Sequence, residues 1–165
     1  MVREAARGED AVAGARGPRF RLWPPVSVGV PWAVGILVEG VAPVSVDLGP
    51  IAVAVGWALI SLFVVWNGWS LALFARRRTG LLPGQATAAL LDQGPYRLSR
   101  NPLYLGMLAL YVGAALVASS WVMLALVPLA FAGLHWGAVR PEERYLSARL
   151  GPAYAEYCDR VPRWL

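Results

Sequence analysis

Four long apolar segments constrain the fold of this chain more than any other feature. They cover residues 25–42, 51–74, 102–118 and 121–139. A helix needs about 20 apolar residues to cross the roughly 30 Å of bilayer hydrocarbon, and only helices or closed barrels satisfy all their backbone hydrogen bonds there. The pattern predicts an all-α fold: a polytopic integral membrane protein with four transmembrane helices.

The placement of charge predicts the topology. All 15 basic residues are arginine, and they lie in three groups, within residues 3–21, 76–100 and 140–163. An even number of spans separates successive groups, so all three lie on one side, as the positive-inside rule requires. The net charge of +5 therefore indicates orientation rather than a nucleic-acid partner. The composition, rich in alanine and free of lysine, is typical of a high-GC bacterium and predicts a bacterial inner (plasma) membrane with both termini cytoplasmic.

The chain divides into a tail and one domain. Residues 1–23 lack apolar periodicity and are expected to form a cytoplasmic tail. Residues 24–165 form a single membrane domain, whose third and fourth segments reverse near residues 118–120. In the cytoplasmic C-terminal segment 140–165, apolar residues recur at helical spacing and are interrupted at Gly151-Pro152. This predicts two short amphipathic helices along the inner membrane surface.

Candidate chemistry gathers at two places that the predicted hairpin brings to one face. Residues 94–106 hold a polar and aromatic run before the third segment, and Glu142 and Glu143 follow the fourth. Arg100 can fork to a carboxylate, and a glutamate can bind an ammonium group or ribose hydroxyls. Tyrosine faces can bound an adenine or a sulfonium cation. The alternative is structural: Arg100 and one glutamate form an ion pair that locks the hairpin to the C-terminal segment.

Two other reactive side chains carry little weight. The single cysteine, Cys158, cannot form an intrachain disulfide and has no neighbouring histidine base, so an inert thiol is expected. The single histidine, His135, lies in the fourth apolar segment, where a packed or interfacial side chain is expected. A lone histidine makes a poor metal site, and no metal is predicted.

Three motifs occur in a recognisable order and spacing. They are Gly94-x-Tyr96-x-x-x-Arg100-Asn101-Pro102-x-Tyr104-x-Gly106, Glu142-Glu143-x-x-Leu146, and Gly151-x-x-Tyr154-x-x-Tyr157-x-x-Arg160-Val161-Pro162. This pattern, which covers roughly residues 79–165, resembles the isoprenylcysteine carboxyl methyltransferase family and its bacterial relatives, including the phospholipid methyltransferases.

The resemblance implies an enzyme, an S-adenosylmethionine-dependent methyltransferase acting at the cytoplasmic membrane face on a lipophilic or small-molecule acceptor. It implies a catalytic group comprising Arg140, Glu142 and Glu143, with Arg140 the nearest candidate for binding a substrate carboxylate. It also implies that the cofactor, S-adenosyl-L-methionine, contacts Ala88, Ala89, Leu90, Leu91, Tyr96, Arg100, Asn101, Pro102, Leu103, Tyr104 and Glu142.

One departure from the family pattern bears on the acceptor. Many members have histidine where this chain has Asn101. An amide cannot act as a base near neutral pH, whereas a carboxylate acceptor is already ionised and needs none. Carboxyl O-methylation is therefore favoured. Phospholipid N-methylation, thiol S-methylation, a reductase that binds a nicotinamide cofactor, and a non-enzymatic membrane protein retaining the hairpin motif stay open, as does the oligomeric state.

Overall fold

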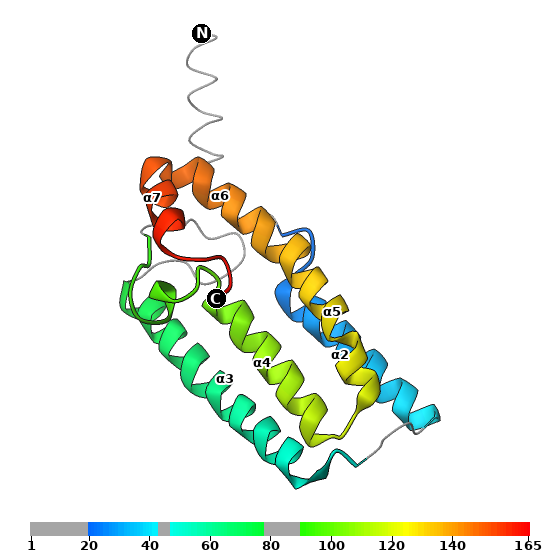
Figure 1. Ribbon diagram of the computed structural model, residues 1–165. Coiled ribbons are helices and arrows are strands. Elements are labelled where there is room, and N and C mark those ends of the chain that lie inside the picture. Colours follow the sequence, from blue (N-terminus) through cyan, green and yellow to red (C-terminus); the bar gives the residue numbers. More distant parts are fainter. Residues whose placement is uncertain (1–19, 43–46, 78–89) are drawn as a thin grey trace.

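The computed structural model describes residues 20–42, 47–77 and 90–165, and that part of the chain is helical with no strand. Long helices form an elongated bundle with shorter helices at one end (Figure 1). The long helices are α2 (Pro24–Val41), α3 (Gly49–Arg77), α4 (Pro102–Val117) and α5 (Trp121–Leu134). The predicted all-α class is confirmed for the described residues.

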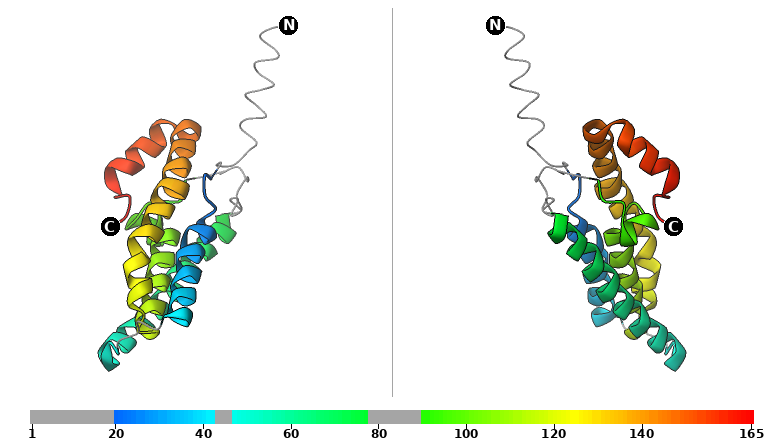
Figure 2. Two further views of the ribbon diagram at one scale, coloured as in Figure 1. Left: turned by 90° about the vertical axis from the view of Figure 1, so that its right-hand side faces the viewer. Right: turned by 90° about the vertical axis from the view of Figure 1, so that its left-hand side faces the viewer.

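The helices pack in an order that differs from their order in sequence. Helix α4 lies between α3 and α5, and α2 packs mainly on α5 (Figures 1 and 2). The reversal between α4 and α5 occurs where it was predicted. Ser119 adopts a positive φ of 51° there, and the Ser120 hydroxyl accepts a hydrogen bond from the Met123 amide to cap α5.

The length and composition of the helices fit an integral membrane protein. Among the residues that the structure describes, three helices are long and apolar enough to cross a bilayer: α2, α3 and the continuous helix Trp121–Leu150. Large apolar side chains of α2 and α3, such as Leu37 and Val65, are more than half exposed, as expected of helices that face lipid. Helix α4 has 16 residues, about 24 Å at 1.5 Å per residue, so its crossing of the membrane stays a prediction.

Glycines allow α3 and α4 to approach closely. A Cβ atom added at Gly56 would lie 2.7 Å from the carbonyl oxygen of Gly113, and one added at Gly113 would lie 2.7 Å from the carbonyl oxygen of Gly56. Neither position can therefore carry a side chain without moving a backbone. Small residues at a helix crossing are the usual way in which membrane helices pack without a hydrophobic driving force between them.

Helix α5 does not end at the predicted border of the span. It continues through a π-helical turn, His135–Val139, into α6 (Arg140–Leu150). Pro141 lies inside this continuous helix, where its missing N–H leaves the Gly137 carbonyl free of its usual partner. The Arg21 and Leu22 amides donate to that carbonyl instead, at 2.9 and 3.2 Å. Because the N-terminal segment satisfies the broken backbone, the helix need not stop there.

The chain turns sharply only after α6. Gly151, with a φ of +54°, separates α6 from α7 (Pro152–Arg160), which confirms the predicted break. Helix α7 and the residues after it fold back toward the start of α4 (Figure 1). The sequence predicts two short helices along the membrane surface. In the structure, α6 continues in the direction of α5, and only α7 turns away from it.

Candidate functional site

The polar run before α4 begins with a short 3₁₀ turn, Gly94–Arg97. Gly94 has a φ of +57°, and its close neighbours are Trp69 and Leu73 of α3, so both its conformation and its surroundings favour glycine. Tyr96 is buried. Its ring meets Phe74 edge to face at a centroid distance of 5.6 Å, and its carbonyl accepts a 2.7 Å hydrogen bond from the Tyr157 hydroxyl. Burial raises the pKa of both tyrosines, so both hydroxyls stay protonated.

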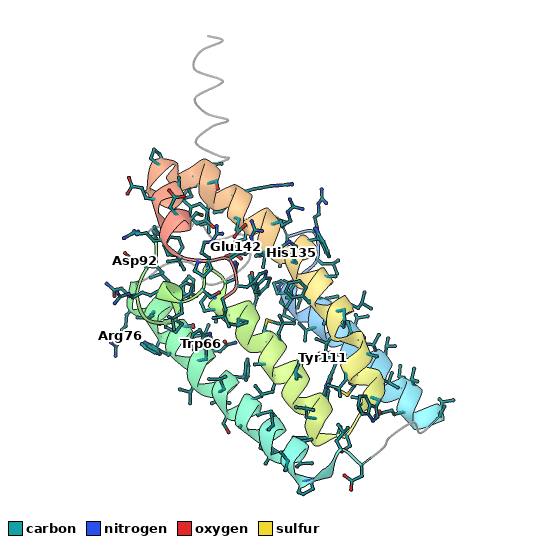
Figure 3. The ribbon with its side chains drawn as sticks, in the orientation of Figure 1. Trp66, Arg76, Asp92, Tyr111, His135 and Glu142 are labelled. Carbon is teal, nitrogen blue, oxygen red and sulfur yellow. The ribbon has the colours of Figure 1, made fainter. Side chains whose placement is uncertain are left out.

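The two adjacent glutamates of α6 have different partners. Glu142 accepts a 2.6 Å hydrogen bond from the hydroxyl of Tyr104, in the first turn of α4. Figure 3 shows Glu142 on the side of α6 that faces the C-terminal segment and the start of α4. The contact joins the second predicted motif to the first, across the hairpin that the sequence predicts.

Glu143 is buried and is held by two arginines. Arg163 donates from Nε to both carboxylate oxygens, at 3.1 and 2.9 Å, and its Nη2 lies 2.8 Å from Oε2. Arg100 approaches the other oxygen at 3.3 Å. The hydrogen bond to Glu143 raises the pKa of Arg163. Such charge-assisted, forked bonds are strong and directional. This carboxylate therefore joins Arg100 of the first motif to Arg163, the residue that follows the third motif.

The C-terminal segment is also fixed to the start of α4 through its backbone. The carbonyl of Arg163 accepts hydrogen bonds from the Asn101 side-chain amide at 3.0 Å and the Ser99 hydroxyl at 3.3 Å. The Arg100 amide donates to the Pro162 carbonyl at 2.9 Å. The side-chain nitrogen of Asn101 thus forms a hydrogen bond within the protein, and this bond holds the C-terminal segment against the start of α4.

Helix α3 holds α4 in register next to the site. The Trp66 indole N–H donates to the Pro102 carbonyl at 2.9 Å, and the Asn67 amide donates to the Leu103 carbonyl at 3.2 Å. Gly106 lies against the Asn67 side chain, with no room for a Cβ atom. These bonds fix the height of α4, and hence of Tyr104, relative to α3.

The remaining predicted site residues fall in different places. Leu91 is buried, and Leu90 packs against the Tyr154, Tyr157 and Val161 cluster. Ala88 and Ala89 lie outside the described residues. Arg140 is exposed at the start of α6 and forms no ion pair within the part of the chain that the structure describes.

Several contacts at the site were not predicted from the sequence. In the sequence, Trp66 and Asn67 lie within an apolar segment, and Arg163 stands out only as part of the charge pattern that predicts topology. Cys158 is not isolated either, since it accepts a 2.7 Å hydrogen bond from Nη1 of Arg100. The sequence did hold a signal for the contacts of α3. An asparagine and an indole N–H in a membrane helix need hydrogen-bond partners in an apolar environment, so a neighbouring helix could have been expected to supply them.

His135 lies near the same end of the bundle, among aromatic rings. Phe131 stacks on it at a centroid distance of 5.8 Å, and Trp136 meets it edge to face at 5.0 Å. A packed or interfacial histidine was predicted, and these ring contacts fit the packed alternative.

Comparison with known proteins adds a family to this geometry. The phospholipid methyltransferase family model matches residues 51–153, from α3 to the start of α7. The chain is 31% identical over 115 residues to the cobalt-zinc-cadmium resistance protein CzcN of Cupriavidus metallidurans, covering 70% of this chain and 49% of that protein. It is 31% identical over 81 residues to the nickel-cobalt-cadmium resistance protein NccN of Alcaligenes xylosoxydans xylosoxydans, covering 49% of this chain and 38% of that protein.

This chain thus spans half or less of the length of the curated relatives that it matches. No solved structure matches it significantly. The family match contains the first two predicted motifs and extends further toward the N-terminus than the resemblance read from those motifs. The match covers more than half of the chain and confirms the predicted family resemblance. The chain belongs to the phospholipid methyltransferase family.

Proposed function

We propose that this protein is an S-adenosylmethionine-dependent methyltransferase that works at the cytoplasmic end of its helical bundle. The observation that carries the proposal is the 2.6 Å bond between Tyr104 and Glu142, which joins two motifs of the family-matched region. A purely structural clamp explains the ion pair of Arg100 with Glu143, but it gives no reason for a second carboxylate held separately by a tyrosine.

The side chains at this end suit such a cofactor chemically. The cofactor carries a cationic sulfonium and ammonium group, hydroxyls and an aromatic base. Glu142 offers a carboxylate to the ammonium group or the hydroxyls, and Tyr96 and Tyr104 offer aromatic rings. The Nε atom of Arg100 is buried, has no hydrogen-bond partner among the described residues, and can donate to a carboxylate. When bound, the cofactor supplies an electrophilic methyl group on sulfur.

The favoured acceptor is an ionised carboxylate on a lipophilic molecule. The acceptor oxygen attacks the methyl carbon, a C–O bond forms, the C–S bond breaks, and its electron pair stays on sulfur. No proton moves, so this reaction needs no base. Asn101 cannot supply one, and its amide already donates to the Arg163 carbonyl. The protein's contribution is alignment and the exclusion of water.

A phospholipid amine is the second candidate acceptor, and the description of the family model favours it. An amine must lose a proton during methylation, and Glu142 is the nearest carboxylate for that purpose in this proposal. A thiol acceptor has the same requirement. The choice of acceptor thus depends on whether Glu142 serves the cofactor alone or also removes a proton.

The names of the matched relatives suggest a cellular role in resistance to cobalt, zinc, cadmium or nickel ions. We propose that any such role of this chain depends on methyl transfer. Expression of the wild type and of Glu142→Gln in a cadmium-sensitive bacterium tests this, because equal protection by the two proteins would separate resistance from methyl transfer.

The direct test supplies the protein in lipid nanodiscs with methyl-labelled S-adenosylmethionine and a total bacterial lipid extract. We expect label in a base-labile lipophilic ester, and none with Glu142→Gln. Label that survives base treatment and stays with a phospholipid amine would favour the second acceptor. No labelled product from any extract, with the cofactor bound, would overturn the proposal of catalysis.

A further inference from the structure

The last residues of the chain place a tryptophan on the side of α5. Trp164 follows Arg163, whose guanidinium is fixed to Glu143. The Trp164 ring centroid lies 5.1 Å from that of Phe131 and 6.2 Å from that of His135. The C-terminal segment thus connects the polar end of the bundle to an aromatic group on the membrane helix, formed by Phe131, His135, Trp136 and Trp164. We call this group the aromatic cluster.

Two polar atoms within the aromatic cluster have no partner in the described structure. They are Nε1 of Trp164 and Nδ1 of His135, and both atoms are buried. Nearly all buried polar atoms in proteins form hydrogen bonds, so two unpartnered ones in neighbouring rings call for an explanation. The indole N–H can only donate. A ligand oxygen that accepts from it would satisfy this atom.

The charges around the aromatic cluster favour an anionic ligand. Arg163 and Arg140 both lie near enough to His135 for their charges to act on it, as does Glu143. The Glu143 carboxylate is already paired with two arginines, whereas Arg140 forms no ion pair among the residues that the structure describes. Two arginines and one carboxylate therefore act on His135.

Two rings of the aromatic cluster are exposed on the surface of the bundle. Phe131 is 37% exposed and Trp136 is 54% exposed, and both belong to a helix apolar enough to span a membrane. The π-helical turn begins at His135, and such turns often occur at functional sites because they redirect side chains. His135 precedes Glu142 by two helical turns, about 10 Å, and Figure 3 shows both on the same long helix near the C-terminus.

We propose that His135 and Trp164 bind the anionic head group of a single-chain lipophilic acceptor, with its apolar chain lying along Phe131 and Trp136. This rests on the proposed methyltransferase function and adds to it the site at which the anionic head group of the acceptor binds. The C-terminal segment then has two tasks, because Arg163 holds Glu143 while Trp164 receives the acceptor.

The test measures binding of radiolabelled hexadecanoic acid to the full chain in nanodiscs, with hexadecyl phosphate and hexadecylamine as competitors. We expect saturable binding of the acid, weak competition by the amine, and about tenfold weaker binding for Trp164→Phe and for His135→Phe. Both variants keep an aromatic ring. Trp164→Phe removes the indole N–H, and His135→Phe removes both imidazole nitrogens. A tenfold loss of affinity matches the value of one hydrogen bond to a charged group. Trp121→Phe, at the opposite end of α5, is the matched control and should bind as the wild type does.

Affinity for S-adenosylhomocysteine is measured on the same samples. Two results overturn this site proposal while the methyltransferase proposal stands, provided that S-adenosylhomocysteine binds. In the first, hexadecanoic acid does not bind at all. In the second, it binds both ring variants as tightly as it binds the wild type. If the amine competes as well as the acid, the anionic specificity is wrong. If hexadecyl phosphate competes more strongly than unlabelled acid, the carboxylic acid is the wrong ligand and the site binds an anionic phospholipid head group instead.

Discussion

The body of the bundle and its polar end are stabilised in different ways. In the body, α3 and α4 meet at Gly56 and Gly113, where backbone lies against backbone and no side chain intervenes. At the polar end, three separated segments are joined by charged and hydrogen-bonded groups around Glu143 and Tyr104. The body therefore depends on shape, and the polar end depends on the identity of each partner.

This difference is the reason that we assign the proposed chemistry to the polar end. Apolar contacts tolerate many substitutions of similar volume, whereas a buried carboxylate loses its stabilisation when one partner is removed. Predictions that damage one region and spare the other therefore test the comparison itself.

The largest expected effect follows removal of the carboxylate shared by two arginines. Glu143→Ala leaves Arg100 mostly buried and without its anionic partner, and it frees Arg163. We expect a loss of about 3 kcal/mol in the free energy of unfolding. Denaturant unfolding in a mild detergent measures this, with Glu156→Ala on the exposed face of α7 as the control. Equal stability of the two variants would show that the ion pairs contribute nothing.

In the body, the next largest effect comes from a single methyl group. Gly113→Ala places a Cβ atom 2.7 Å from the Gly56 carbonyl, so the helices must separate at an expected cost of about 2 kcal/mol. Gly29→Ala is the matched control, because no atom lies within 4 Å of its added Cβ, and higher helix propensity should leave it neutral or slightly stabilised. Thermal unfolding of the pair checks this, and a Gly113→Ala variant as stable as Gly29→Ala would refute close packing at this crossing.

Binding at the polar end should respond to the loss of one hydroxyl. Tyr104→Phe removes the donor to Glu142, and we expect affinity for S-adenosylhomocysteine to fall about tenfold, as for a hydrogen bond to a charged group. Tyr111→Phe on the same helix removes a buried hydroxyl that has no partner in the described structure, so it should leave affinity unchanged. Isothermal titration in detergent separates the two, and the assignment fails if both variants bind alike.

The smallest effect is expected for the arginines after α3. Arg76 is exposed at the end of that helix, and we predict that its charge serves only orientation. Arg76→Ala should leave both stability and affinity for S-adenosylhomocysteine within error of the wild type. A marked loss of affinity would move this arginine from topology into the cofactor site.

Much of this arrangement was predictable from local pattern. The apolar segments, the reversal before Ser120 and the break at Gly151 follow from hydropathy and turn chemistry. The meeting of Glu142 with the first motif follows from a hairpin of two similar helices. Such features depend on residues that are close in sequence or on the geometry of one connection.

The features that could not be predicted depend on where the chain goes after an element ends. The return of Arg163 to Glu143 requires the path of the segment after α7, which no local preference fixes. The continuation of α5 into α6 requires the amides of Arg21 and Leu22 to satisfy the carbonyl that Pro141 leaves free. The roles of Trp66 and Asn67 depend on the register of α3 against α4, which only the packed pair of helices determines.

Equilibrium binding of S-adenosylhomocysteine to the solubilised wild type and to Glu142→Gln tests the central claim most directly. The substitution keeps the shape of the side chain and removes its charge. We predict saturable binding by the wild type and at least tenfold weaker binding by the variant, with the same melting temperature for both. No binding by a folded wild type, or equal affinity in the two proteins, would contradict the claim that Glu142 and Tyr104 form part of a cofactor site.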